Sequence, residues 1–140
     1  MKIDVCFSPA LYPVYHNPEA IVVVVDVFRA TTTMAAAFSN GVRSIRPVAT
    51  VEEAEAYKAK GWLVGAERNV KRCSFADFGN SPFDYTAEKV SEKDIVFTTT
   101  NGTRAITLFA QRQGIAGQPG GEPFRLGTRA GVKVLTSLGD

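Results

Sequence analysis

Cysteine, histidine and long apolar runs are all scarce in this 140-residue sequence. Its two cysteines, Cys6 and Cys73, lie far apart without a Cys-x-x-Cys spacing, which argues against a disulfide framework or a cysteine zinc site. The longest apolar run, residues 21–25, is far shorter than the roughly 20 residues that a membrane span requires. The first residues, MKIDVCFSP, do not form a secretory signal. We therefore expect a cytoplasmic protein that has no contact with membranes.

A strong excess of either charge is also missing. The chain has 16 Lys and Arg residues against 14 Asp and Glu residues, and no dense basic stripe with interleaved aromatic side chains is visible. Nucleic-acid binding is therefore not expected. A hydrophobic content of 45% with 21% charged residues is typical of an ordinary globular domain.

The hydrophobic pattern alternates between strand-like and helix-like segments. Residues 21–28 form a nearly continuous apolar, β-branched run, which predicts a central strand buried on both faces of a parallel sheet. Thr50 and Glu53 form a capping box at the start of a helix. This alternation predicts an α/β fold, with a mainly parallel or mixed sheet flanked by helices. The other expected strands are 3–7, 42–48, 62–66 and 94–98, and the expected helices are 31–39, 50–61, 86–90 and 103–112.

The last quarter of the chain differs in composition from the rest. Residues 113–140 are rich in Gly, Pro and Arg and show no sustained periodicity, apart from a short strand candidate at 132–135. We therefore expect an α/β domain over residues 1–112, followed by an atypical tail. The composition of that tail resembles translation in a shifted reading frame, so we also expect a truncated or frameshifted product.

Two strand-to-helix junctions carry the polar residues that suggest chemistry. The first runs from Asp26 through Arg29 to three threonines, Thr31–Thr33, and the second is Thr98–Arg104, which contains Asn101-Gly102. Helix N-termini with hydroxyl groups and an arginine favour phosphate oxygens. Two structural alternatives remain open. Asp26 could pair with Arg29 while a threonine caps the helix, and Asn-Gly could form a hairpin turn.

A polar loop between residues 67 and 82 adds two carboxylates, Glu67 and Asp77. Mg²⁺ binds oxygen ligands, usually one or two carboxylates together with water and a substrate phosphate. With Asp26, these acids are candidate metal ligands, although each taken alone is more simply an ordinary ion-paired or solvated acid. Together with the two junctions they predict a Mg²⁺-dependent phosphoryl transfer to water.

Four strings in this order, DVFRATTT, GAERN, FADFGNSP and TTTNGTRA, resemble the 2-phosphosulfolactate phosphatase family. The resemblance covers residues 1–110 and implies Mg²⁺-dependent hydrolysis of (2R)-O-phospho-3-sulfolactate, a step in coenzyme M biosynthesis. Its implied ligand is a small phosphorylated organic acid, and a homo-oligomer is left open. Family members are much longer, so the tail departs from their pattern.

The residues that match the family's strings are assigned expected roles as follows. Catalysis is assigned to Asp26, Arg29 and Arg104; phosphate binding to Thr31, Thr32, Arg68, Asn80, Ser81, Thr99, Asn101, Gly102 and Thr103; and metal binding to Asp26, Glu67 and Asp77.

Two other readings are weaker or belong to another class. A haloacid-dehalogenase-like phosphatase is disfavoured, because Phe28 stands where the second Asp of the DxDxT pattern should be. An inactive fragment or a phosphate-binding module without turnover is the alternative from a different class.

Overall fold

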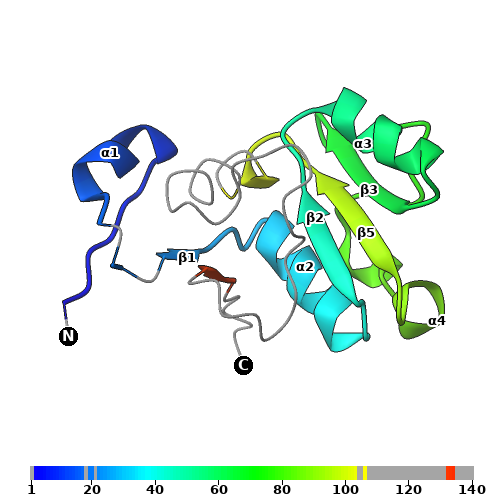
Figure 1. The fold of residues 1–140 in the computed structure, drawn as a ribbon, viewed down its shortest axis with the longest axis horizontal. Helices are drawn as coiled ribbons and strands as arrows, with labels where there is room; N and C mark the ends of the chain where they lie inside the picture. Colours follow the sequence, from blue (N-terminus) through cyan, green and yellow to red (C-terminus); the bar gives the residue numbers. More distant parts are fainter. Residues whose placement is uncertain (1, 18, 21, 104–105, 107–131, 135–140) are drawn as a thin grey trace.

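The main sheet has four strands. In the computed structural model, which describes residues 2–17, 19–20, 22–103, 106 and 132–134, the strands lie in the order β2-β5-β3-β4 (Figure 1). Strands β2, β5 and β3 are parallel, and β4 is antiparallel to β3. The predicted α/β fold with a mixed sheet is therefore confirmed. The bounds are β2 Ser44–Pro47, β3 Leu63–Arg68, β4 Lys71–Arg72 and β5 Asp94–Thr98.

Two helices, α2 and α3, cover opposite faces of this sheet. The alternation of side chains along β5 shows the two layers, because Ile95 and Phe97 belong to the core that contains α2, whereas Val96 belongs to the core that contains Ala54 of α3. Both faces of the parallel strands are thus buried, as is usual for such sheets. The helices are α2 Ala30–Ser39, α3 Val51–Ala59 and α4 Ala87–Val90, with a short 3₁₀ turn, η2, at Pro82–Asp84.

Local sequence signals set the helix ends. The backbone N–H of Glu53 donates to Thr50 Oγ1 at 3.2 Å, and Glu53 Oε2 accepts from the Thr50 N–H at 3.2 Å, so the predicted capping box is present. Gly41 follows α2 with a φ of 84°, a conformation that glycine adopts without a steric penalty. The predicted helices at 31–39 and 50–61 are therefore confirmed.

A smaller part of the structure lies beside this body. A 3₁₀ turn, η1 (Pro9–Leu11), leads into α1 (Tyr12–Tyr15), and β1 (Val22–Val24) pairs in parallel with β6 (Val132–Val134) in a separate two-stranded sheet (Figure 1). The short strand expected near 132–135 is therefore present.

Two strand predictions in the N-terminal part are wrong. Residues 3–7 form no strand, because no described segment offers them a partner for backbone hydrogen bonds. Residues 21–28 were expected to form the central buried strand, yet β1 contains only Val22–Val24 and stands outside the main sheet, with Val23 and Val25 exposed. An apolar, β-branched run does not by itself determine where in a sheet a strand lies.

The expected helix at 103–112 is described only in part, since residues 102, 103 and 106 are helical and the rest lies outside the described residues. Most of the tail at 113–140 also lies outside them, so the boundary at residue 112 stays a prediction. In the described part of the chain, no helix is long and apolar enough to cross a membrane.

We predict that Gly65→Ala destabilises the protein. A β-carbon at Gly65 would lie 2.2 Å from Tyr85 Oη and 2.6 Å from Phe97 Cδ2, both in the buried core, so the core must shift. We expect a loss of about 1–3 kcal/mol in the free energy of unfolding, measured by urea denaturation. Gly79→Ala is the control, because its nearest neighbour would be Arg72 Cβ at 3.6 Å. Equal stability of the two variants would contradict this account of the core.

Candidate functional site

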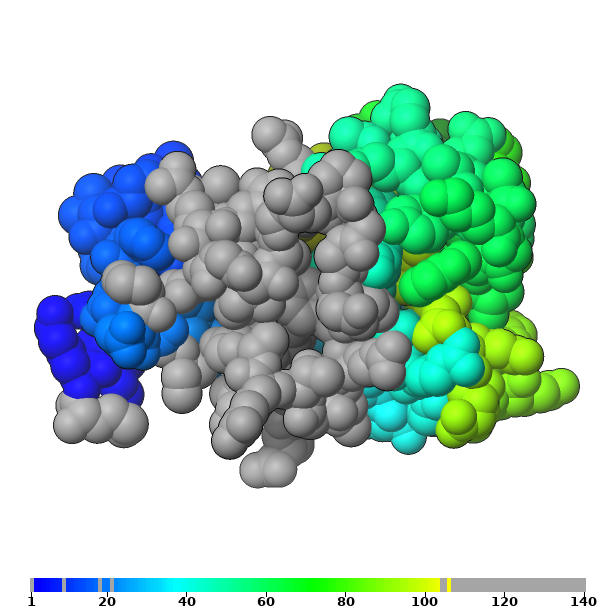
Figure 2. All heavy atoms as spheres, in the orientation of Figure 1, coloured from blue at the N-terminus to red at the C-terminus, as the bar shows by residue number. Residues whose placement is uncertain are grey.

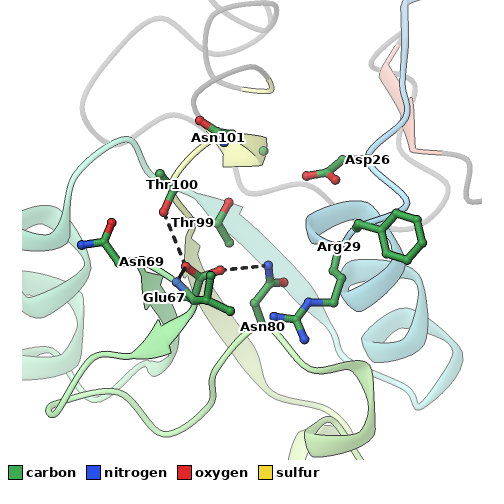
Figure 3. Close-up of a pocket in the computed structure, with 11 residues that line it drawn as sticks. Asp26, Arg29, Glu67, Asn69, Asn80, Thr99, Thr100 and Asn101 are labelled. Atoms are coloured by element: carbon green, nitrogen blue, oxygen red, sulfur yellow. Dashed lines mark hydrogen bonds between the residues drawn. The ribbon is translucent and has the colours of Figure 1, made fainter.

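A pocket of about 560 Å³ opens where the carboxyl ends of β3 and β5 meet the two strand-to-helix junctions (Figure 3). Ligands of parallel α/β sheets commonly bind at this edge. Eight of its eleven lining residues have polar or charged side chains. The lining residues are Asp26, Phe28, Arg29, Glu67, Asn69, Val70, Asn80, Thr99, Thr100, Asn101 and Gly102.

The first junction is held together by one buried hydroxyl group. Thr31 lies in the first turn of α2 and is fully buried. Its Oγ1 accepts the N–H of Asp26 at 2.8 Å and donates to the Asp26 carbonyl at 2.8 Å. The hydroxyl therefore fixes the backbone of Asp26 and is not free to bind a phosphate.

The second junction repeats this arrangement. Thr103 Oγ1 accepts the N–H of Thr99 at 2.9 Å and donates to the Thr99 carbonyl at 3.1 Å, and Thr103 is also fully buried. Its backbone N–H donates to Thr99 Oγ1 at 3.3 Å. Both junctions thus use a helical threonine to fix the residue that ends the preceding extended segment.

The two junctions touch each other at Asp26 and Gly102. Asp26 Oδ2 accepts the N–H of Ala30, the first residue of α2, at 3.3 Å. A β-carbon at Gly102 would lie 2.7 Å from the same oxygen and 2.4 Å from Ala30 Cβ. Only glycine allows this close approach of backbone to carboxylate.

The alternative in which Asp26 pairs with Arg29 is not what the structure shows. None of the ion pairs among the described residues joins these two side chains. Arg29 instead extends toward Asn80 along the wall of the pocket (Figure 3). The guanidinium is thus available to an anion in the pocket.

Glu67 supplies a second carboxylate from the other side of the pocket (Figure 3). Its side chain is buried, and Oε1 accepts the N–H of Val70 at 2.8 Å and the hydroxyl of Thr100 at 3.5 Å. Asn80 Nδ2 donates to Oε2 at 3.5 Å, and the backbone of Asn80 is fixed by the hydroxyl of Thr33 at 3.1 Å. No cationic side chain in the described residues pairs with Glu67, so three hydrogen bonds stabilise its buried carboxylate.

Sequence reasoning missed four residues of the wall: Phe28, Asn69, Val70 and Thr100. Asn69 and Val70 form the two-residue turn between β3 and β4, with φ values of 52° and 64°. Two-residue hairpin turns with positive φ usually have Gly at the second position, so Val70 at this position did not indicate a turn. Asn69 and Thr100 stand within strings already singled out, GAERN and TTTNGTRA, so their proximity in sequence could have indicated them.

Two of the expected site residues point elsewhere. Arg68 donates to the Glu67 carbonyl at 2.7 Å and to Thr98 Oγ1 at 2.8 Å, so it braces β3 against β5. Asp77 accepts the N–H of Val64 at 2.8 Å and pairs with Lys58 at 2.5 Å. Neither side chain lines the pocket, and the structure does not bring Asp77 together with the other two acids.

Of the other predicted phosphate ligands, four lie outside the pocket lining. Thr31 and Thr103 fix the backbone at the two junctions, Thr32 Oγ1 donates to the Val27 carbonyl at 3.0 Å, and Ser81 precedes η2 without a side-chain cap. Arg104 lies outside the described residues. The predicted residues that the structure does bring together are Asp26, Arg29, Glu67, Asn80, Thr99, Asn101 and Gly102.

The charge of this pocket determines what it could bind. Its described wall carries two carboxylates, those of Asp26 and Glu67, but one guanidinium, that of Arg29. A phosphate group brings close to two further negative charges at neutral pH. An anion would therefore be repelled unless a cation entered with it.

The oxygen donors of the pocket fit a hard cation. Asn80 Oδ1 is buried and has no hydrogen-bond partner, while Nδ2 of the same amide donates to Glu67 Oε2. One or two carboxylates, supplemented by neutral oxygens and water, form the usual protein part of a Mg²⁺ site. A cluster of three or more His, Cys, Asp or Glu side chains is absent from the described residues, so the expected set of three acids is not assembled.

Comparisons with known proteins agree with the resemblance in the sequence. Residues 6–117 match the family described as 2-phosphosulpholactate phosphatase. A protein of Thermotoga petrophila named "Probable 2-phosphosulfolactate phosphatase" is 47% identical over 94 residues, which cover 67% of this chain and 41% of that protein. One of Clostridium beijerinckii with the same name is 39% identical over 111 residues, covering 76% and 47%. The chain thus spans about half the length of the curated relatives that it matches.

We predict that Thr31→Val destabilises the protein and disturbs the pocket, whereas Thr31→Ser does neither. Valine leaves the partly buried N–H and carbonyl of Asp26 without their partner, which costs about 1–3 kcal/mol for an unsatisfied polar group. Serine keeps the hydroxyl. Urea denaturation measures the loss, and a Thr31→Val variant as stable as the wild type would show that this hydroxyl does not hold the junction.

Proposed function

We propose, on the premise that the chain belongs to the 2-phosphosulfolactate phosphatase family, that its pocket binds a phosphomonoester and transfers the phosphoryl group to water. The observation that carries this proposal is the convergence of two strand-to-helix junctions, Arg29 and two separate carboxylates on one pocket. Hydroxyl groups, a guanidinium and carboxylates are groups that can bind a phosphate ester, directly or through a cation, and stabilise its transition state.

The proposed substrate is a small phosphorylated organic acid, with (2R)-O-phospho-3-sulfolactate as the first candidate. The name of the relatives, "Probable 2-phosphosulfolactate phosphatase", supports this choice. The products would be 3-sulfolactate and phosphate, the step used in coenzyme M biosynthesis. Both ends of this ester are anionic, so its binding to a wall with two carboxylates and one guanidinium would depend on a cation that binds with it.

We assign Mg²⁺ to the side of the pocket formed by Glu67 and Asn80. When bound, the ion would neutralise phosphoryl oxygens and so favour the increase of charge in the transition state. The buried carboxylate of Glu67 and the unpartnered Oδ1 of Asn80 support this assignment. Thr100 donates to Glu67 and would keep its carboxylate oriented.

The residues on the opposite wall would contact the phosphoryl group and the attacking water. Arg29 extends along the pocket and would donate to the phosphoryl oxygens, while the hydroxyl of Thr99 and the amide of Asn101 line the same space (Figure 3). Asp26 is held by Ala30 and lies against Gly102. We assign to its carboxylate the task of orienting the attacking water and accepting its proton.

Phosphate release from 2-phosphosulfolactate, measured with Mg²⁺ and then with excess EDTA, tests this function. We expect metal-dependent release that falls at least about 100-fold in Asp26→Asn and in Glu67→Gln, since each removes a charged group from the site. Asp77→Asn is the matched control, because Asp77 lies outside the pocket. It should keep activity close to that of the wild type.

Two results would contradict the proposal. Equal activity in the Glu67→Gln and Asp77→Asn variants would remove Glu67 from the site. Binding of phosphate without any turnover of the ester would instead support a phosphate-binding module.

A further inference from the structure

The loop that carries Asn80 is held by two buried hydroxyl groups. Tyr85 Oη donates to the carbonyl of Gly79 at 2.8 Å, and Thr33 Oγ1 donates to the carbonyl of Asn80 at 3.1 Å. Tyr85 is 1% exposed, and Thr33 is fully buried. We call Tyr85 Oη and Thr33 Oγ1 the hydroxyl pair. Two consecutive carbonyls are thus fixed from two different elements, since Thr33 belongs to α2 and Tyr85 follows η2.

The residue before this loop is fixed by β3. The N–H of Phe78 donates to the carbonyl of Val64 at 3.0 Å, and the N–H of Ala66 donates to the carbonyl of Phe78 at 3.0 Å. The chain leaves β3 after this point. Among the described residues, no backbone N–H donates to the carbonyls of Gly79 and Asn80. The hydroxyl pair therefore takes the place of backbone hydrogen bonds where the chain approaches the pocket.

Tyr85 occupies a place in the core that an apolar ring could fill. The ring centroids of Phe78 and Phe97 lie 4.8 and 6.1 Å from that of Tyr85. A buried hydroxyl needs a hydrogen-bond partner, and here the partner is the carbonyl of Gly79. Burial raises the pKa of Tyr85 above its usual range, so the hydroxyl stays protonated and able to donate. Tyr85 thus gives the loop a bond that Phe could not give.

Thr33 differs from the two threonines before it. The hydroxyls of Thr31 and Thr32 donate to carbonyls five residues earlier in the chain. A threonine in a helix often bonds a carbonyl of the preceding turn in this local way. Thr33 instead donates to a carbonyl 47 residues later, that of Asn80. This hydroxyl therefore joins α2 to the loop across the core.

We propose that Tyr85 and Thr33 are positioning residues for the cation site, an inference that rests on the proposed function. Neither lines the pocket, so both act through Asn80, whose backbone the hydroxyl pair fixes. Figure 3 shows the amide of Asn80 directed toward Glu67, and its Nδ2 donates to Glu67 Oε2 at 3.5 Å. The hydroxyl pair thereby determines where Asn80 Oδ1, the neutral oxygen assigned to the cation, lies relative to the Glu67 carboxylate.

Mg²⁺ titration of the ¹⁵N-labelled chain, followed by NMR, tests this role without using activity. The side-chain amide of Asn80 and the backbone amide of Val70, which donates to Glu67, are the reporters. We expect both to shift along one binding curve in the wild type. Tyr85→Phe and Thr33→Val should each raise the Kd for Mg²⁺ about 10- to 100-fold, as is typical when a group that orients a metal ligand is removed. Thr33→Ser keeps the hydroxyl and should bind Mg²⁺ like the wild type.

Val96→Ala is the control that separates positioning from a general loss of stability. Val96 is buried in the core on the face of β5 that α3 covers, whereas Tyr85 belongs to the core on the opposite face. In the space-filling view, α3 forms the upper right of the molecule (Figure 2). This variant should lower the Tm, because it leaves a cavity, but keep the Kd for Mg²⁺ unchanged. Circular dichroism establishes that each variant is folded.

Two results would overturn this proposal alone. Equal Mg²⁺ affinity in the wild type, Tyr85→Phe and Thr33→Val would show that the hydroxyl pair stabilises only the core. An equal rise in the Kd of Val96→Ala would attribute the effect to stability. A wild-type chain that binds no Mg²⁺ would instead contradict the proposed function, and this proposal would fail with it.

Discussion

The pocket depends on one kind of interaction, a buried threonine hydroxyl that binds both backbone groups of the residue ending the preceding extended segment. Thr31 does this for Asp26, and Thr103 does it for Thr99. Each hydroxyl satisfies two buried backbone groups that would otherwise be costly. The side chains of Asp26 and Thr99 are thereby directed into the pocket, and the two helix N-termini meet at Gly102. The threonine hydroxyls of these junctions thus hold the backbone, and the groups that we propose to bind ligand belong to neighbouring residues.

Electrostatics explains why this scaffold would need a cation. The described wall is negative, since Asp26 and Glu67 outweigh Arg29. Among the described residues Glu67 is buried without a basic partner, and Oδ1 of Asn80, whose Nδ2 donates to Glu67, has no hydrogen bond. A divalent ion would satisfy both groups and at the same time attract a phosphate. The negative charge therefore favours joint binding of cation and phosphate over binding of a free anion.

The sequence indicated the fold class and much of the site because these follow from local rules. Alternating strands and helices predicted the α/β sheet, and Thr50 with Glu53 predicted the start of α3. Roles that depend on the direction of a side chain could not be predicted in this way. The local sequence does not show that Arg68 contacts Thr98, or that Asp77 pairs with Lys58, instead of facing the pocket. The position of β1 could not be predicted either, because its pairing with the distant strand β6 is not encoded in the residues of β1 alone.

The central claim is that the two junctions and Glu67 form one site that binds phosphate together with a divalent cation. Titration of the ¹⁵N-labelled chain with inorganic phosphate, followed by NMR, tests it most directly. With Mg²⁺ present, the amide signals of Ala30, Asn101 and Gly102 should shift together along one binding curve, and the shifts should vanish on addition of EDTA. Equal binding of phosphate without Mg²⁺, or shifts confined to residues outside the pocket, would contradict the account.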